Sequence, residues 1–153
     1  MKVRLILTAA FALASAGLVS CGADPSDMTS TDGAPSASVV SNKITGSVEE
    51  WKVEVSAQKA EAGEVIFAMA NYGSIAHEFL VTKTSYEPGM IPVGDNNRFD
   101  EEGEGVMVPG EIPEWEPGTT GTVTLKLDAG NYQLLCNIAG HYKNGMYTQL
   151  TVS

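Results

Sequence analysis

The sequence has 153 residues, of which 43% are hydrophobic. This length suffices for one domain with a hydrophobic core and is short for two domains. Asp and Glu number 19 against 9 Lys and Arg, so the formal net charge is −10. Nucleic-acid binding needs clusters of basic residues for the phosphates, and this composition excludes that class of function.

The first 20 residues have the pattern of a secretory signal peptide. Lys2 and Arg4 precede an apolar run from Leu5 to Leu18, and small residues follow where a peptidase could cut. A membrane-spanning anchor is the alternative, but the run is shorter than the roughly 20 residues that a spanning helix needs. We therefore expect residues 1–20 to direct export.

The end of this segment, Leu18-Val19-Ser20-Cys21, resembles the bacterial lipobox. The resemblance implies that Cys21 becomes the first residue of the mature protein and carries a lipid. The protein would then be held on the outer side of the cytoplasmic membrane or in the periplasm. Plain cleavage nearby, with Cys21 as a spare thiol, is the alternative. Residues 21–42 are rich in Ser, Asp, Gly, Ala and Pro, which predicts a flexible tether ahead of a folded domain at 43–153.

The remaining chain has the pattern of short β-strands separated by turns, and no stretch has a sustained helical period. Segment 84–116 is expected to hold a short strand or helical turn near 105–108 and otherwise to wrap the surface. This pattern predicts an all-β fold, a Greek-key β-sandwich with antiparallel or mixed sheets. The expected strands are 51–55, 64–70, 77–82, 122–127, 131–136 and 146–152.

One loop between the last two strands holds three potential metal ligands, Cys136, His141 and Met146. A thiolate and two imidazoles in a plane, with a weak axial thioether, form the ligand set of a blue-copper site. The chain has only two histidines. His77, at the start of a predicted strand, is therefore the candidate for the second imidazole.

Other interpretations of the same residues are open. Cys-His-His also suits a tetrahedral zinc site, although zinc would leave Met146 without a role and would not need the turn-forming Gly140 and Gly145. A nucleophilic Cys-His enzyme is a further alternative. Such thiols are often activated at a helix N-terminus, whereas Cys136 ends a predicted strand. Each residue could also be an ordinary core or surface side chain.

The loop CNIAGHYKNGMY, with its Cys-x4-His-x4-Met spacing, resembles that of the cupredoxins and is similar in spacing to the rusticyanin and sulfocyanin branch. The resemblance covers about residues 43–153 and includes the approach Asn71-Tyr72-Gly73 to the first histidine. It implies a Greek-key β-sandwich, one mononuclear type 1 copper ion and electron transfer. The ligands that it implies are the imidazoles of His77 and His141, the thiolate of Cys136 and the axial thioether of Met146.

We therefore predict a protein that is not an enzyme and carries single electrons, as a monomer, between redox partners such as membrane-bound cytochromes or oxidases. A copper-binding protein for delivery, storage or resistance is the alternative, and a copper-free structural module is a third. The resemblance also implies an exposed edge of His141. We expect partners to dock on the apolar residues beside it, Ile138-Ala139 and Tyr142.

Three further features concern the surroundings of the ligands and the surface. Glu78 stands where many cupredoxins have Asn, which leaves the hydrogen bonding to the thiolate open. The acidic run 100–104 is interpreted as a solvated face, with a docking patch for a basic partner or a calcium site as alternatives. Trp51 and Trp115 are predicted to be packing residues.

Overall fold

The computed structural model describes residues 39–153. The expected signal peptide, Cys21 and most of the expected tether lie outside the described residues. Within 39–153, no helix is long and apolar enough to cross a membrane. The elements of this part are β1 (Lys43–Glu49), β2 (Lys52–Val55), β3 (Lys59–Ala60), β4 (Gly63–Asn71), β5 (His77–Thr84), β6 (Val106–Trp115), β7 (Thr120–Leu127), β8 (Gly130–Leu135), the 3-10 turn η1 (Tyr142–Asn144) and β9 (Tyr147–Val152).

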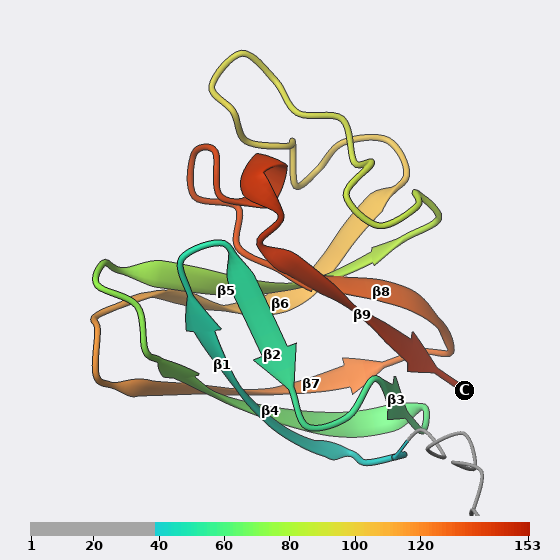
Figure 1. Ribbon diagram of the computed structural model, residues 1–153. Coiled ribbons are helices and arrows are strands. Elements are labelled where there is room, and N and C mark those ends of the chain that lie inside the picture. Colours follow the sequence, from blue (N-terminus) through green and yellow to red (C-terminus); the bar gives the residue numbers. More distant parts are fainter. Residues whose placement is uncertain (1–38) are drawn as a thin grey trace, which may run out of the picture. The chain divides into compact units, whose positions relative to one another are not determined.

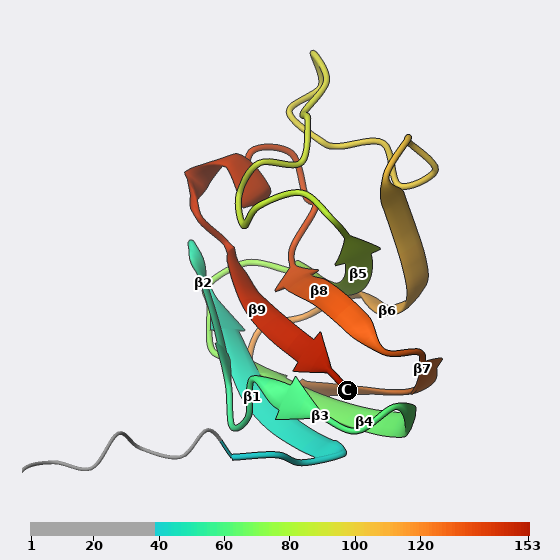
Figure 2. The same cartoon turned by 90° about the vertical axis from the view of Figure 1, so that its right-hand side faces the viewer.

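The strands form two sheets that face each other (Figures 1 and 2). A four-stranded sheet has the order β2-β1-β4-β7, and a five-stranded sheet has the order β3-β9-β8-β5-β6. The pairs β1–β4 and β3–β9 are parallel and the other pairs are antiparallel, so both sheets are mixed. The chain passes between the sheets from β2 to β3, β3 to β4, β4 to β5, β6 to β7 and β7 to β8. The predicted all-β Greek-key sandwich is confirmed.

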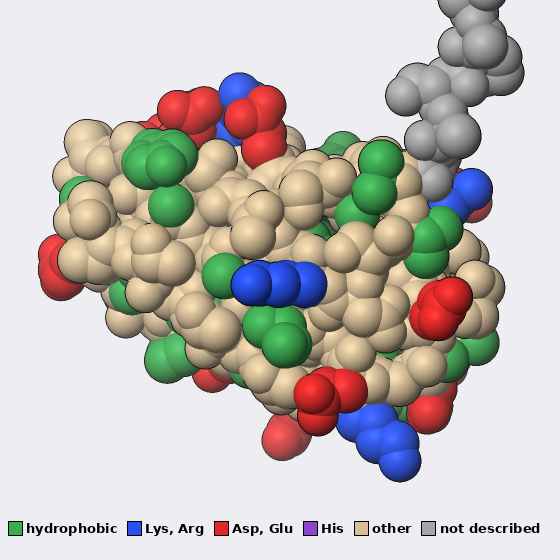
Figure 3. Space-filling model, turned by 90° about the horizontal axis from the view of Figure 1, so that it is seen from below, with side chains coloured by type: hydrophobic (Ala, Val, Ile, Leu, Met, Phe, Trp, Pro, Cys, Tyr) green, Lys and Arg blue, Asp and Glu red, His purple; other side chains and the backbone are tan. Residues whose placement is uncertain are grey.

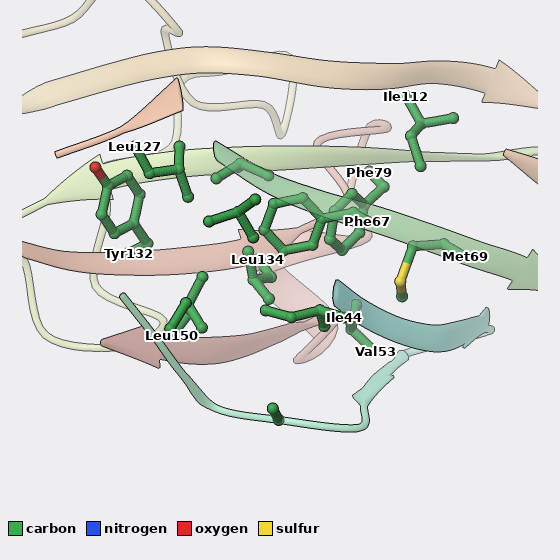
Figure 4. Packing of buried hydrophobic residues seen from close by; sticks show 14 of the residues in the cluster. Ile44, Val53, Phe67, Met69, Phe79, Ile112, Leu127, Tyr132, Leu134 and Leu150 are labelled. Atoms are coloured by element: carbon green, nitrogen blue, oxygen red, sulfur yellow. The ribbon is translucent and has the colours of Figure 1, made fainter. Parts of the chain in front are cut away.

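The main core lies between the sheets because side chains alternate along each strand. In β4, Val65, Phe67 and Met69 are buried and point to one face. Phe67 meets Phe79 of β5 across the sandwich with a ring-centroid distance of 5.5 Å (Figure 4). Each such side chain contributes about 1.5–3 kcal/mol through burial, and together they hold the two sheets in a fixed relation.

Strand β5 is buried on both faces. Its inner face contributes to the main core, while Leu80 on the opposite face belongs to a second cluster of buried residues. Segment 85–105, at the top of Figure 1, lies over this face. The second cluster, called the outer cluster below, consists of Leu80, Ile91, Phe99, Leu135 and Tyr142. The segment that was expected to wrap the surface therefore also carries core residues.

Two strands differ from the sequence prediction. Strand β6 spans ten residues where only a short strand near 105–108 was expected. Pro109 and Pro113 argued against a longer strand, because proline cannot donate a hydrogen bond to a neighbouring strand. They are tolerated because β6 is at the edge of its sheet. Strand β1 was not predicted, and it pairs with β2 in a hairpin whose register, Glu49 opposite Lys52, leaves Glu50 and Trp51 as the turn.

The predicted roles of the two tryptophans have different outcomes. Trp115 packs against the main core, as predicted. Trp51 belongs to the hairpin turn and not to a strand; 49% of its surface is exposed, so it lies outside the core and packs instead against the ring of His141. The alternation of Trp51 with Val53 and Val55 had suggested a continuous strand, but the turn reverses the chain just before Lys52.

The outer face of the four-stranded sheet is solvated. Along β7 the residues alternate, with Val123 and Leu125 packed against the core and Thr120, Thr122 and Thr124 exposed. Figure 3 views this side of the domain and shows most charged side chains near its rim. The metal-ligand candidates lie at another end, where β5 begins and β8 ends (Figure 1).

Candidate metal centre

Strand alternation directs two of the candidate ligands into the interior. His77 opens β5 and has the same parity as Phe79 and Val81, which face the main core. Cys136 follows β8 and has the same parity as Leu134 of the main core. The β5–β8 pairing holds these two strand ends beside each other.

The nitrogen and sulfur atoms of three residues converge. The Sγ atom of Cys136 lies 3.3 Å from Nδ1 of His141 and 4.0 Å from Nδ1 of His77. The ligating atoms of all three residues lie within 4.8 Å of one another. Metal–sulfur and metal–nitrogen bonds of ordinary length in a trigonal plane put sulfur and nitrogen about 3.8 Å apart. The observed distances fall on either side of this value, so the three side chains fit a metal ion.

The fourth candidate, Met146, comes directly before β9 and is fully buried. It belongs to the same hydrophobic cluster as Cys136. Its carbonyl oxygen accepts a hydrogen bond from the Cys136 backbone N–H (3.2 Å), and its own N–H donates to the His141 carbonyl oxygen (3.2 Å). Two imidazoles, a thiol and a thioether are the donor types of a type 1 copper site.

The loop between Cys136 and Met146 is bent where the sequence predicted turns. Gly140 and Gly145 adopt positive φ angles of 86° and 100°, a region that glycine enters without a steric penalty. Gly145 ends η1, and its N–H donates to the Tyr142 carbonyl oxygen at 3.0 Å. These bends allow one short loop to direct three ligands to one point.

Burial sets the ionisation of the three donors. It raises the pKa of the Cys136 thiol to about 11, an effect opposed by the backbone N–H groups of Glu78 and Ile138. Burial also lowers the pKa of His77 and of His141, and for His141 the neighbouring His77 adds to this shift. Neutral imidazoles are ready to bind a metal, whose positive charge favours the thiolate.

Glu78 acts on the thiol through its backbone and its side chain in opposite directions. Its backbone N–H lowers the pKa of Cys136, whereas the charge of its carboxylate raises it. The buried Asn137 side chain supplies the connection between loops: its Oδ1 accepts from the Phe99 N–H (3.0 Å), and its Nδ2 donates to the Phe99 carbonyl oxygen (3.1 Å) and to Oε1 of Glu101 (2.9 Å). Asn137 therefore fixes segment 85–105 to the ligand loop, a role that the sequence analysis missed.

The acidic residues near the site have separate environments. Burial raises the pKa of Glu78 to about 7, opposed by the positive charge of Arg98. Glu101 of the acidic run 100–104 accepts the hydrogen bond from Asn137, so it has a structural partner. Asp100 Oδ1 accepts from the Glu102 N–H at 3.0 Å, which is a local turn contact.

His141 is covered, contrary to the sequence-based expectation of an exposed edge. Only 5% of its surface and 1% of that of Tyr142 are exposed. Tyr142 is enclosed in the outer cluster, and the indole ring of Trp51 lies edge-on to the His141 ring with centroids 5.2 Å apart. The predicted docking residues Ile138 and Ala139 are partly buried and exposed, respectively.

A glycine makes room for the far side of the His77 ring. The Nε2 atom of His77 is buried and has no hydrogen-bond partner among residues 39–153. A Cβ atom on Gly73 would lie 2.6 Å from this nitrogen and 2.9 Å from Oε2 of Glu50. Glu50 is held in place by the N–H and hydroxyl groups of Ser74, at 2.8 and 2.7 Å, and these bonds lower its pKa to about 2.

Comparisons with known proteins agree with this architecture. The model of the sulfocyanin (SoxE) domain family matches residues 35–153. No curated protein matches the sequence. Among solved structures, the fold is similar to that of dithionite-reduced auracyanin from the photosynthetic bacterium Roseiflexus castenholzii, with a TM-score of 0.58 and 18% identity over 75% of this chain and 99% of that chain.

Two further solved structures share the fold. Rusticyanin from Thiobacillus ferrooxidans has a TM-score of 0.52 and 18% identity, over 72% of this chain and 76% of that chain. Auracyanin B has a TM-score of 0.52 and 14% identity, over 80% of this chain and 95% of that chain. At these identities the likeness concerns the fold, whereas the family match concerns the sequence.

The space at Gly73 leads to a testable prediction. The backbone of Gly73 is not at positive φ, so Gly73→Ala acts through steric overlap alone, most severely with His77 at 2.6 Å and less with Glu50 at 2.9 Å. We expect the His77 ring to be displaced and the affinity for Cu(II) to fall roughly 10- to 100-fold, as measured by titration of the apoprotein. Gly94→Ala is the matched control, because its nearest atom would lie at 3.4 Å. Equal affinities of the two variants would contradict the prediction.

Proposed function

Because the chain belongs to the sulfocyanin (SoxE) domain family and places His77, Cys136, His141 and Met146 as a type 1 copper site, we propose that it carries single electrons outside the cytoplasm. The observation that supports this most directly is the convergence of the two Nδ1 atoms on the Cys136 sulfur. The copper ion, when bound, supplies the one-electron couple. The chain's own residues fix the positions of the donors.

The donor set suits a carrier because it meets the needs of both oxidation states. Thiolate and thioether favour Cu(I), and imidazole binds either state. Backbone hydrogen bonds among Cys136, His141 and Met146 hold the loop, and the surrounding core keeps out water. A site held in this way changes little when an electron is gained or lost.

Burial of the ligands favours the carrier over the alternative of copper delivery, storage or resistance. Delivery requires an acceptor to reach the metal and replace its ligands one by one. Cys136 and Met146 are fully buried, and His141 is covered by Trp51. We propose redox proteins as partners, among them membrane-bound cytochromes or oxidases, and a monomeric carrier.

The thiolate ligand gives the primary test. Cu(II)-loaded protein should show an intense charge-transfer band toward the red end of the visible range, because a Cys sulfur bonds directly to copper. Cys136→Ser should abolish this band in a folded protein. The control is Cys21→Ala, which changes the other of the two cysteines and should leave the spectrum intact. A band that survives in Cys136→Ser would refute the proposed site.

The axial position is tested by the reduction potential. Met146→Gln replaces a weak thioether with a harder oxygen donor, which stabilises Cu(II) and should lower the potential, while copper binding persists through three strong ligands. Met107→Gln is the control, because Met107 is exposed on β6. Potentiometric titration measures both variants. An unchanged potential in Met146→Gln would show that Met146 is not a ligand.

Export and lipid anchoring are part of the same proposal. The basic start, the apolar run and the segment Leu18-Val19-Ser20-Cys21 support them. Residues 21–42 would then act as a tether between the lipid and the domain. Cys21→Ala should move the protein from the membrane fraction to the soluble exported fraction, as followed by fractionation and immunoblotting. Native protein found entirely in the soluble fraction would contradict the anchor.

A further inference from the structure

We propose that Trp51 carries electrons between the copper site and a redox protein with a basic rim, which docks on an apolar surface formed by Trp51, Tyr72 and Ile75. This inference rests on the proposed function of electron transfer. It replaces the expected exposed edge of His141 with a different residue. The surface named here is called the tryptophan patch below.

Trp51 connects the buried ligands to solvent. All four ligand side chains are buried, with His141 the most accessible at 5%. Trp51 touches the His141 ring, with centroids 5.2 Å apart and ring planes at 83°. Since 49% of Trp51 is exposed, it connects a ligand ring to the surface through a single aromatic contact.

The backbone of Trp51 is strained. Its φ angle is +67°, a region that costs a residue with a side chain about 1–2 kcal/mol. The two-residue turn of the β1–β2 hairpin would be served better by Gly or Asn at this position. Strain of this kind persists where the side chain it presents has a use. Here it directs an indole ring onto His141.

Further apolar side chains are exposed on the segment that is bonded to the hairpin. Tyr72 and Ile75, exposed by 73% and 45%, lie in the segment between β4 and β5. Two contacts hold this segment against the hairpin: the Tyr72 N–H donates to the Val48 carbonyl oxygen at 2.9 Å, and Ser74 hydrogen-bonds to Glu50. Figure 1 shows the hairpin turn and the ligand loop at neighbouring positions.

Charge around the patch identifies the partner. The paired part of the hairpin, residues 46–55, carries Glu49, Glu50 and Glu54 but one basic residue, Lys52, which pairs with Glu49 at 3.2 Å and with Glu54 at 2.8 Å. A net negative rim remains. A partner with Lys residues around an exposed redox group would be attracted to this rim, and its apolar centre would meet the tryptophan patch. Aromatic residues at the centre of such small interfaces carry much of their binding energy.

The kinetic test uses a basic c-type cytochrome in its oxidised form, which takes up the one electron that the reduced copper protein gives up. Trp51→Gly relieves the backbone strain and should fold with its visible copper band in place. We expect its rate of cytochrome reduction to fall about tenfold or more. Trp51→Phe should retain most of the rate, because an aromatic ring still contacts His141.

Two controls separate the contributions. Tyr72→Ala removes part of the docking surface and contacts no ligand. Its rate of cytochrome reduction should be low at low cytochrome concentration and should reach the native rate at saturation. The rate of Trp51→Gly should stay low at saturation. Met107→Ala removes an exposed apolar side chain from β6. Met107 lies opposite Lys83, near the end of β5 that is far from His77, so this variant should react at the native rate. A native rate in Trp51→Gly at all concentrations would overturn the role of Trp51.

Docking can be tested without copper. The chain has two tryptophans, so the ¹⁵N-labelled apoprotein gives two indole N–H signals, which Trp51→Phe assigns. Addition of the basic cytochrome should shift the Trp51 signal and leave that of Trp115, whose Nε1 donates to the Thr119 carbonyl oxygen. High salt should reverse the shift. A shift of Trp115 alone, or of neither signal, would place the docking surface elsewhere.

Failure of the inference differs from failure of the proposed function. If the native protein shows the blue band but reduces neither the cytochrome nor a small inorganic oxidant, the proposed electron transfer fails. If the native protein reduces both and Trp51→Gly matches it, electron transfer stands and the tryptophan path fails.

Discussion

Cys136 brings its sulfur into the dry interior at the end of β8, where burial raises the pKa of the thiol to about 11. The same burial is what a thiolate ligand needs to be shielded from solvent and competing ligands. The backbone N–H groups of Glu78 and Ile138 offset part of this cost. A metal ion supplies the rest, because its charge favours the deprotonated sulfur.

A second layer keeps these donors in place. Asn137, next to Cys136, bonds to Phe99 and Glu101 of segment 85–105, and the outer cluster buries the other side of the ligand loop. In addition, the Tyr142 hydroxyl donates to Oε1 of Gln133 on β8 (2.8 Å). Segment 85–105 therefore holds the ligand loop in position, and this limits movement of the ligands during electron transfer.

Most strands could be predicted because their alternation is local. The buried positions of β4 and the parity that points Cys136 inward follow from a period of two residues. Two elements were not predicted for identifiable reasons. Strand β6 was not predicted in full because it contains Pro109 and Pro113, which a strand tolerates only at the edge of a sheet. The hairpin turn was not predicted because Trp51 alternates with Val53 as in a continuous strand. Only the pairing of β2 with β1 shows where the chain reverses.

The sequence by itself determined the donor set, because three ligands lie within one short loop and the two histidines leave no other choice for the fourth. Local spacing and turn residues such as Gly145 carry that information. Only the tertiary structure decided what surrounds the donors. Asn137 meets Phe99 from 38 residues away, and Trp51 meets His141 across the sandwich. Contacts between distant segments depend on how the sheets pack, and no local pattern encodes which side chain will cover a ligand.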